Sequence, residues 1–401
     1  MGHSAVNRLW RQKVGTALKF SCTSLPGGHA AATISRMRTA VVSDLHLGAL
    51  GGADLTRDTG VRERLVEALS GADRVVLLGD VLELRERPIA QALEVARPLV
   101  DALGSALAGR TLVVVPGNHD HALAEPWLAR LRLDGVELAA NGEWPVSPED
   151  DAMGRLADAM PEVELRLAYP GLWLRPDVYA THGHYLDLDL TIPRLESIAA
   201  SLMGRLTGRG RDCSSAADYE AVLAPIYAFY ERLTDGAGPE ALSRGGTLSR
   251  TVWKRATGEG RAGRLLLGRV AIPGAVGVLN RLGLGPFGTE LTGTELRRAG
   301  LLAMGRVADA LAPGAEHVLF GHTHRPGPLL GDDLAEWTTL SGSRLWNSGT
   351  WFREWAFMRG DDIDNPYYPG TVLTIDDEGP PRLENPLKDA GSGSGTAAPS
   401  A

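Results

Sequence analysis

The sequence of 401 residues contains only two cysteines, Cys22 and Cys213, which lie far apart and form no CxxC pair. This scarcity excludes a disulfide framework and a zinc site built on thiolates, and it favours a reducing, cytoplasmic compartment. An excess of basic residues is lacking as well, because the formal net charge is −8. An acidic balance argues against general nucleic-acid binding, which needs a basic face.

A long apolar run is also missing. The longest uncharged one, residues 270–280, contains Pro273 and is too short to cross a bilayer, so we expect no transmembrane helix. Residues 1–36 carry five Lys or Arg, no Asp or Glu, and no apolar core of a secretory signal. Their composition fits an organellar transit peptide, but we favour a disordered or wrongly annotated extension, because Met37 opens the segment MRTAVVSDLHLG.

Short β-branched runs alternate with helical or loop patterns between residues 38 and 182. RTAVVS, RVVLLGD and TLVVVPGNHD are runs of this kind, and VYATHG and EHVLFGH repeat the pattern later in the chain. Continuous apolar runs of this length predict buried strands, and their alternation with helices predicts an α/β fold. Several short strand candidates follow one another between residues 329 and 375, without helices between them.

Residues 191–310 interrupt this pattern. They hold 16 Lys or Arg against 11 Asp or Glu, although the whole chain is acidic. SSAADYEAVLAPIYAFYERL begins on serines that suit a helix N-cap, and TELRRAGLLAMGRVADALAPG runs from Thr294, a candidate cap, to a Pro-Gly stop. We therefore predict a mostly helical insertion.

These patterns predict the organisation of the whole chain. We expect an extension at 1–36, a core made of 37–190 and 311–385, a mostly helical cap at 191–310 and a flexible tail at 386–401.

The histidines cluster at the ends of the predicted strands. Eight of the ten lie after residue 36, and none of these falls in the 191–310 insertion. SDLH supplies Asp44 and His46 with one residue between them, and in an extended segment such side chains share a face. Because open α/β sheets place their binding crevices beyond the strand ends, one layer of loops can gather the whole set.

The candidate ligands favour a pair of metal ions. Imidazole, carboxylate and amide oxygen ligands suit Mn, Fe, Zn or a related divalent ion. Seven candidates are too many for one tetrahedral catalytic zinc, but they suit two ions that share a carboxylate about 3.5–4 Å apart. The candidates are Asp44, His46, Asp80, Asn118, His182, His322 and His324.

Five short motifs occur in a fixed order, namely DLH at 44–46, GD at 79–80, GNHD at 117–120, THG at 181–183 and GHTH at 321–324. In order and in flanking strands this series resembles the calcineurin-like metallophosphoesterases. The resemblance covers more than half of the chain. It implies an α/β fold with two sheets between helical layers, an αββα sandwich, and a phosphoesterase with two divalent ions, of which we favour manganese.

The resemblance also implies a role for each site residue. Asp44, His46 and His324 would hold the first ion, Asn118, His182 and His322 the second, and Asp80 would bridge them. His119 would donate a proton or hydrogen bond to the leaving oxygen, oriented by Asp120. A hydroxide that bridges the ions would attack phosphorus, so no protein nucleophile is needed.

Five further residues stay ambiguous in the sequence. His184 could replace His182 as a ligand or support it, and we favour His182 because it directly precedes the glycine. His121 and His317 fit structural or surface roles. Arg325, which follows GHTH, could contact phosphate or form an exposed salt bridge. Asn347 in LWNSGTW resembles a loop residue that helps to position a metal-bound histidine.

In the family that the sequence resembles, segments between the fourth and fifth motifs often cover the active site, and the insertion lies at that place. Residues 244–269 contain seven Lys or Arg and one Glu, followed by the apolar run VAIPGAVGVLN. This combination could bind a nucleotide-linked lipid or a phospholipid headgroup, and it resembles the lid of UDP-2,3-diacylglucosamine diphosphatases. Alternatively, the apolar residues pack onto the core and the arginines face water.

We therefore expect a cytoplasmic, two-metal phosphoesterase for a phosphomonoester, phosphodiester or pyrophosphate bond. Its substrate would be a small molecule or a lipid-linked phosphoester, with peripheral membrane contact through the cap and without an obligate protein partner. A nucleic-acid phosphodiesterase is the alternative enzyme, which the acidic core disfavours. A binding or scaffold protein that keeps the fold without catalysis is the alternative from another class.

Overall fold

The structure is a computed structural model that describes residues 37–147, 149–209, 212–236, 272–288, 292–353, 357–358 and 362–389. The chain divides into two units, residues 1–36 and 37–401. Three predictions concern residues outside the described ones: the N-terminal extension at 1–36, the basic segment 244–269 and the end of the tail after 389.

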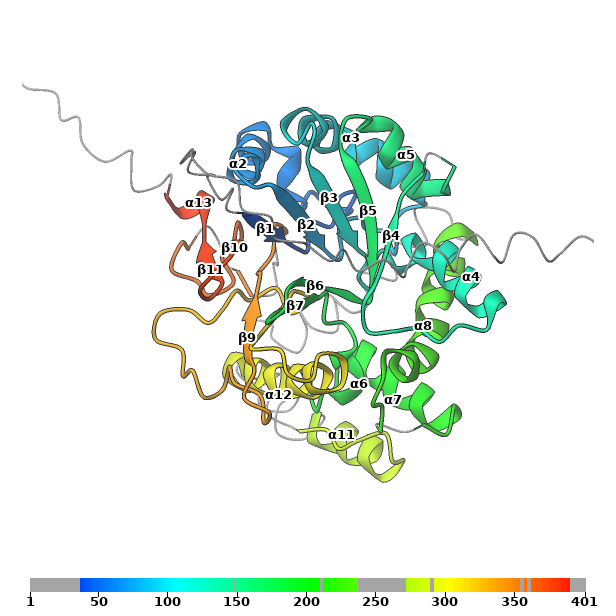
Figure 1. Ribbon diagram of the computed structural model, residues 1–401. Helices are drawn as coiled ribbons and strands as arrows, with labels where there is room; N and C mark the ends of the chain where they lie inside the picture. The colour runs from blue at the N-terminus through cyan, green and yellow to red at the C-terminus, as the bar shows by residue number, and fades with distance from the viewer. Residues whose placement is uncertain are drawn as a thin grey trace, which may run out of the picture. The chain divides into compact units, whose positions relative to one another are not determined.

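The larger sheet has seven strands in the order β11-β10-β1-β2-β3-β5-β4 (Figure 1). Its parallel strands are β1 (Thr39–Val42), β2 (Arg74–Leu78), β3 (Thr111–Val115) and β5 (Glu164–Tyr169). Antiparallel strands close both edges, namely β4 (Gly142–Pro145), β10 (Val372–Ile375) and β11 (Arg382–Glu384).

The smaller sheet has four strands in the order β6-β7-β8-β9. They are β6 (Gly171–Arg175), β7 (Val178–Thr181), β8 (His317–Phe320) and β9 (Arg344–Asn347). β7, β8 and β9 are parallel, although more than 130 residues separate β7 from β8 in the chain. The five strands expected from the apolar runs are confirmed, and the segment between 329 and 375 supplies β9 and β10.

The strands of the larger sheet are apolar on both faces because each face meets a different layer. Successive side chains of a strand point to opposite sides. Val42, Val75 and Leu77 belong to the core under the helices, whereas Val41 and Val76 belong to the core between the sheets. Leu172, Val178, Ala180 and Leu319 of the smaller sheet complete this second core. The arrangement is the predicted αββα sandwich.

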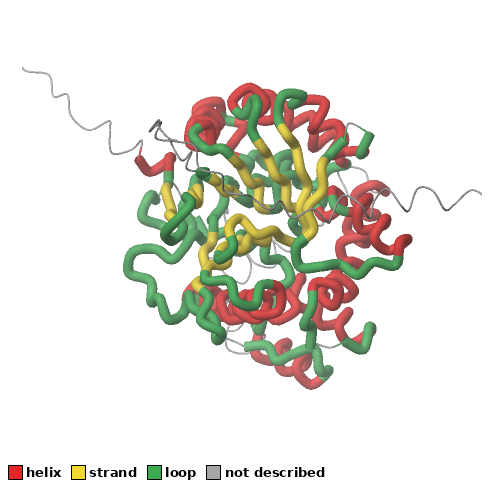
Figure 2. The backbone as a smooth tube through the Cα atoms, in the orientation of Figure 1, coloured by secondary structure: helices red, strands yellow, loops and turns green. Residues whose placement is uncertain are grey.

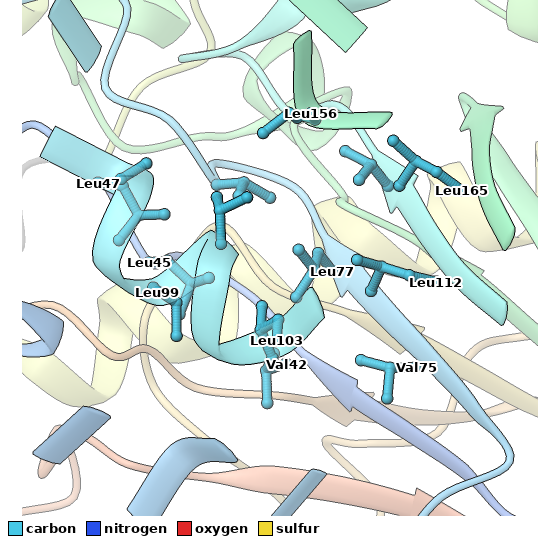
Figure 3. Packing of buried hydrophobic residues seen from close by; sticks show 14 of the residues in the cluster. Val42, Leu45, Leu47, Val75, Leu77, Leu99, Leu103, Leu112, Leu156 and Leu165 are labelled. Atoms are coloured by element: carbon cyan, nitrogen blue, oxygen red, sulfur yellow. The ribbon is translucent and has the colours of Figure 1, made fainter. Parts of the chain in front are cut away.

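Helices cover the outer face of each sheet (Figure 2). α2 (Thr59–Ser70), α3 (Ile89–Ala106) and α5 (Asp151–Ala159) pack on the larger sheet. Figure 3 shows Leu99 and Leu103 of α3 against Val42 and Leu77 of the strands. On the other side, α6 (Leu186–Asp189) and α12 (Gly293–Leu311) share a core with Val318 and Phe320 of β8. Shorter elements join the layers, namely η1 (Leu55–Arg57), η2 (His121–Leu123) and α4 (Glu125–Asp134).

The described part of residues 191–310 is mostly helical, as predicted. It contains α7 (Leu195–Leu206), α8 (Ala216–Gly236), α11 (Ile272–Arg281) and most of α12. Ser215 caps α8, since its hydroxyl oxygen accepts from the Asp218 N–H at 3.2 Å. The predicted cap of α12 is wrong: Thr292 accepts from the Glu295 N–H, and Thr294 lies inside the helix. The division into core and cap domains stays a prediction, and α12 covers the smaller sheet.

The segment predicted as a flexible tail begins with a short helix, α13 (Pro386–Asp389). Its start is fixed by Asn385, whose side-chain oxygen accepts from the N–H groups of Leu387 and Lys388. Leu387 also packs against the core under the helices. The prediction of a flexible segment is therefore wrong for residues 386–389. None of the helices in the described residues is long and apolar enough to cross a membrane.

Candidate metal centre

All five sequence motifs follow the carboxyl ends of parallel strands. β1 ends at Val42, β2 at Leu78 and β3 at Val115, directly before the first three motifs. β7 ends at Thr181, the first residue of the fourth motif, and β8 ends at Phe320, directly before the fifth. The N–H of His322 donates to the carboxylate of Asp44 at 3.1 Å, which ties the last motif to the first across the two sheets. The strand ends therefore gather loops that are up to 280 residues apart.

The predicted ligands occupy an unusual backbone conformation. Among the described residues, six residues other than glycine have a positive φ, and five of them are predicted ligands. They are Asp44 (54°), His46 (45°), Asp80 (50°), His322 (64°) and His324 (60°). The expectation of an extended DLH segment is therefore wrong, since left-handed turns aim these side chains. Such strain costs about 1–3 kcal/mol per residue and concentrates at functional sites.

Two motif glycines are required because other motif residues press against them. Gly79 has a φ of 88°, and a Cβ atom there would clash with the His182 ring. A Cβ atom on Gly117 would clash with both the Asp80 carboxylate and the His182 ring. Glycine is the residue that tolerates this conformation and this close approach. The glycines thus allow the second and third loops to converge on His182.

The first group of ligand atoms comes from Asp44, His46 and His324, all within 4.8 Å of one another. Nε2 of His324 lies 3.2 Å from Oδ1 of Asp44 and 3.3 Å from Nε2 of His46. Burial would raise the pKa of Asp44, but His324 and His182 bring that pKa below its usual value. An ionised carboxylate between two imidazole nitrogens is a ligand set for a divalent cation.

The second group comes from Asp80, His182 and His322, again within 4.8 Å. Nδ1 of His182 donates to the Leu78 carbonyl at 2.9 Å, which leaves Nε2 with a lone pair directed into the site. Within the described residues, this Nε2 and Oδ1 of Asn118 are buried without a hydrogen-bond partner. Because buried polar atoms are nearly always satisfied, these two orphaned atoms fit a bound cation.

Asp80 lies where the two groups meet. Its Oδ2 is 3.3 Å from Nε2 of His182 and 3.8 Å from Nε2 of His46. Burial would raise the pKa of Asp80, but the surrounding imidazoles hold it well below its usual value. One carboxylate between two sets of ligands fits a pair of ions that share it.

Glu83 is a site residue that the sequence did not reveal. Nδ1 of His46 bonds to its Oε2 at 2.9 Å, and Nδ1 of His119 bonds to both of its oxygens at 2.8 Å. Burial would raise the pKa of Glu83, but the two histidines lower it, so the carboxylate is ionised. The only signal in the sequence was a lone glutamate three residues after Asp80. Such a carboxylate fixes the tautomer of a histidine that binds a metal through its other nitrogen.

Asp120 has a different role from the predicted one. Its carboxylate accepts from the backbone N–H groups of Gly117, Asp80, Val81 and Leu82 at 2.6 to 3.2 Å. The expectation that Asp120 orients the ring of His119 is wrong, because Glu83 contacts that ring. Asp120 instead ties the GNHD loop to the GD loop, and so it shapes the backbone that carries Asp80.

The structure separates His182 from His184. His182 points to Asp80, whereas Nε2 of His184 lies 3.3 Å from the Tyr169 hydroxyl and its ring packs on Tyr185. Burial keeps the pKa of His184 well below its usual value, so the ring is neutral. The geometry favours His182 as the ligand and gives His184 a place behind it.

Arg325 and Asn347 support the last motif from outside. Both terminal nitrogens of Arg325 bond to Asp332 at 2.9 and 2.7 Å, and the residue is buried. Arg325 therefore makes a salt bridge, and the bridge is buried where the sequence suggested an exposed one. Nδ2 of Asn347 donates to the Gly321 carbonyl at 2.8 Å and to Oγ1 of Thr323 at 2.9 Å. Asn347 holds the backbone of the GHTH loop.

Three other residues complete the surroundings. His121 bonds to Glu220 at 2.8 Å, and His317 accepts from Nε1 of Trp346 at 3.2 Å, so both have structural partners. Asp187, which the sequence did not single out, lies 3.1 Å from Nε2 of His322. This contact leaves the other ring nitrogen of His322 for an ion.

Residues 37–205 match the family model of the calcineurin-like phosphoesterases. The matched segment includes β1, β2, β3 and β7 with the first four motifs. These residues form a calcineurin-like phosphoesterase domain. The fifth motif lies beyond the match, and β8 brings it to the same site. The match and the two groups of ligand atoms support a metal-dependent phosphoric ester hydrolase.

Other comparisons with this chain are weaker. A search of curated proteins finds no match. Among solved structures, a dimetal phosphatase from Danio rerio is 12% identical, with 86% of this chain and 98% of that chain covered at a TM-score of 0.30. That likeness is loose.

Proposed function

We propose that the protein hydrolyses a phosphomonoester, phosphodiester or pyrophosphate bond with two divalent ions. The first ion would be held by Asp44, His46 and His324, the second by Asn118, His182 and His322, with Asp80 between them. The observation that carries this proposal is the meeting of both ligand groups at Asp80. When bound, the ions supply the attacking hydroxide and neutralise charge on the phosphoryl group.

His119 would deliver the proton to the leaving oxygen. Its Nδ1 is engaged by Glu83, which leaves Nε2 as the nitrogen that can transfer a proton. The side chain of His119 is 24% exposed, against 4% for the neighbouring His46. A substrate can therefore reach His119, whereas His46 faces the interior. A positioned acid of this kind contributes about 10²- to 10⁴-fold to a rate.

We favour manganese over iron or zinc at both positions. The proposed ligands mix imidazole nitrogens with carboxylate and amide oxygens and include no thiolate, a set that suits these ions. Atomic-emission analysis after equilibration with each metal in turn would test this preference. Retention of zinc alone, with activity only in zinc, would contradict it.

We also propose a lipid- or nucleotide-linked substrate, and contact with a membrane surface from the cytoplasm. Leu206 at the end of α7 is 71% exposed, and Leu282 just after α11 is 57% exposed. The two helix ends adjoin, since the Arg205 side chain lies against Gly283. Exposed apolar side chains beside basic ones suit an anionic bilayer surface.

Sedimentation with vesicles tests this contact. Binding to phosphatidylglycerol vesicles, weakened by salt and by Leu206→Glu, would support it. Equal recovery in the supernatant with and without vesicles would contradict it. A screen of soluble and lipid-linked phosphoesters with manganese would then identify the substrate class.

Metal analysis combined with a chromogenic phosphodiester assay tests the proposed reaction. Asp80→Ala should lose bound metal and activity, whereas His119→Ala should keep the metal and lose activity. Glu63→Ala, at an exposed position of α2, is the matched control. Two bound ions without turnover of any of a broad panel of phosphoesters would favour a scaffold protein. Strongly salt-dependent cleavage of DNA would favour a nucleic-acid phosphodiesterase.

A further inference from the structure

The helix α8 reaches from one loop of the proposed site to another. Near its start, Glu220 accepts from Nε2 of His121, which follows the GNHD motif, at 2.8 Å. Near its end, the hydroxyl of Thr234 donates to the carbonyl of Arg85, which follows the GD motif, at 3.2 Å. The part of α8 between Glu220 and Thr234 therefore spans the distance from the loop after the third motif to the loop after the second.

The start of α8 is fixed by a buried hydrogen-bond network. Besides His121, the Glu220 carboxylate accepts from the hydroxyls of Tyr169 at 2.6 Å and Tyr185 at 2.9 Å. Burial would raise the pKa of Glu220, but His121 and the two hydroxyls lower it. A fully satisfied buried carboxylate fixes the position of the helix that carries it.

Tyr227 follows Glu220 by seven residues, which places both on the same face of the helix. Its ring packs on His121 and His184, with centroid distances of 4.8 and 5.5 Å. The side chain is buried, and its hydroxyl has no hydrogen-bond partner within the described residues. Burial raises the pKa of Tyr227 well above its usual value, with further contributions from Asp187 and Glu220, so the hydroxyl is a donor.

Arg85 lies at the other end of this stretch. Its guanidinium carbon is 4.6 Å from the centroid of the Tyr230 ring, and Nη1 is 3.7 Å from Oε1 of Glu196. Its Nε is buried and likewise has no hydrogen-bond partner in the described part of the chain. Burial would lower the pKa of Arg85, but Glu196 and Asp80 raise it. A fixed positive charge thus lies within electrostatic reach of Asp80.

These two unsatisfied donors belong to the same neighbourhood. The Arg85 guanidinium lies over the ring of Tyr230, which follows Tyr227 by three residues on α8. The charge of Arg85 also contributes to the pKa of Tyr227 and, together with burial, lowers that of His119. A buried donor without a partner costs about 1–3 kcal/mol, so two of them beside a phosphoesterase site indicate a missing acceptor. The substrate of a phosphoesterase carries such acceptors as phosphate oxygens, which pair well with arginine.

We propose that Arg85 and Tyr227 form an anion recess that binds a phosphate oxygen of the substrate beside the metal centre. This inference rests on the proposed function. The recess joins the phosphoesterase core to α8, so the inserted helix takes part in substrate binding. The oxygen can come from the scissile phosphoryl group or from a second phosphate next to it.

Calorimetric binding of two ligands to the manganese-loaded full chain separates these sources. Inorganic phosphate stands only for the scissile phosphoryl group, whereas ADP carries a neighbouring phosphate as well. The informative variants are Tyr227→Phe, which removes only the hydroxyl, and Arg85→Met, which removes the charge. Tyr368→Phe and Arg97→Met are matched controls at positions that this site does not include.

We expect binding to weaken about tenfold to hundredfold in either informative variant, as for loss of one hydrogen bond to a charged group. Weaker binding of both ligands assigns the recess to the scissile phosphoryl group, and weaker binding of ADP alone assigns it to the second phosphate. Unchanged dissociation constants for both ligands in both variants, with wild-type metal content, would overturn the proposal. Failure of wild type to bind metal or hydrolyse any phosphoester would instead refute the proposed function.

The melting temperature separates a recess from a merely structural hydroxyl. Because the Tyr227 hydroxyl is unsatisfied without ligand, Tyr227→Phe should melt at or above the wild-type temperature while it binds ADP more weakly. A marked fall in melting temperature together with unchanged binding of both ligands would count against the recess.

Discussion

Replacement of Glu83 by glutamine removes a negative charge and keeps nearly the same shape. The wild-type carboxylate accepts from Nδ1 of His46 at 2.9 Å and from Nδ1 of His119 at 2.8 Å. Its Oε1 also accepts from the backbone N–H of Arg85 at 3.2 Å. A glutamine has one acceptor oxygen, so its NH₂ group must face at least one of these N–H groups. The variant therefore loses at least one charge-assisted hydrogen bond.

The size of the effect follows from that lost bond. A hydrogen bond to a charged group contributes about 1.5–3 kcal/mol. Because each 1.36 kcal/mol of activation free energy corresponds to about a tenfold change in rate, kcat at saturating metal should fall by about 10- to 150-fold. Through His46, the affinity for manganese should fall by about 10- to 100-fold.

The assay is hydrolysis of bis-p-nitrophenyl phosphate at increasing manganese concentrations, with metal affinity measured by calorimetry. Glu63→Gln, an exposed glutamate on α2, is the control and should behave as wild type. Wild-type kcat and wild-type metal affinity in Glu83→Gln would refute the reasoning that this carboxylate orients His46 and His119.

Three further predictions concern other parts of the site. His119→Gln should lower kcat by about 10²- to 10⁴-fold and keep both ions, as metal analysis would check, whereas loss of metal would make His119 a ligand. Gly117→Ala should abolish metal binding, because its Cβ would clash with the Asp80 carboxylate; normal metal content would contradict this. Glu220→Gln should lower the melting temperature most between pH 4.5 and 6.5. The contribution of Glu220 to the free energy of unfolding disappears as the pH falls through its lowered pKa. The contribution of His121 disappears as the pH rises through its raised pKa. A difference in melting temperature between wild type and variant that stays constant with pH would contradict a stabilising Glu220–His121 ion pair.

The sequence predicted the strands and the ligand set because both leave patterns in it. A buried parallel strand is a continuous apolar run, and the residue after such a run is at the edge of the sheet. Asp80 and Asn118 could be placed in this way from their own strands, without knowledge of which strands are neighbours.

Residues that act through long-range contacts leave no such pattern. Glu83 and Glu220 each lie within three residues of another acidic residue, so the sequence does not single them out, and only the fold brings them to histidines. Arg325 was ambiguous because its partner, Asp332, is held by the turn that follows GHTH. The N-cap of α12 could have been predicted from the sequence, since Thr292 and Glu295 have the spacing of a capping box. Thr294 has no Glu or Gln three residues later.

The backbone conformation of the site could not be predicted from the sequence either. An i, i+2 pair on an extended segment would place both side chains on one face, but Asp44 and His46 are both left-handed. Left-handed residues other than glycine are rare, so pattern rules do not anticipate them. Here convergence of the loops fixes the strained turns, and the turns direct the ligands.

Titration of the metal-free protein with manganese, with phosphodiester hydrolysis followed in the same samples, tests the two-metal claim most directly. We expect the rate to rise until two ions are bound per chain, and Asp80→Asn to show neither tight binding nor turnover. A rate that reaches its maximum with one ion bound, or an Asp80→Asn variant with wild-type stoichiometry and turnover, would contradict the account.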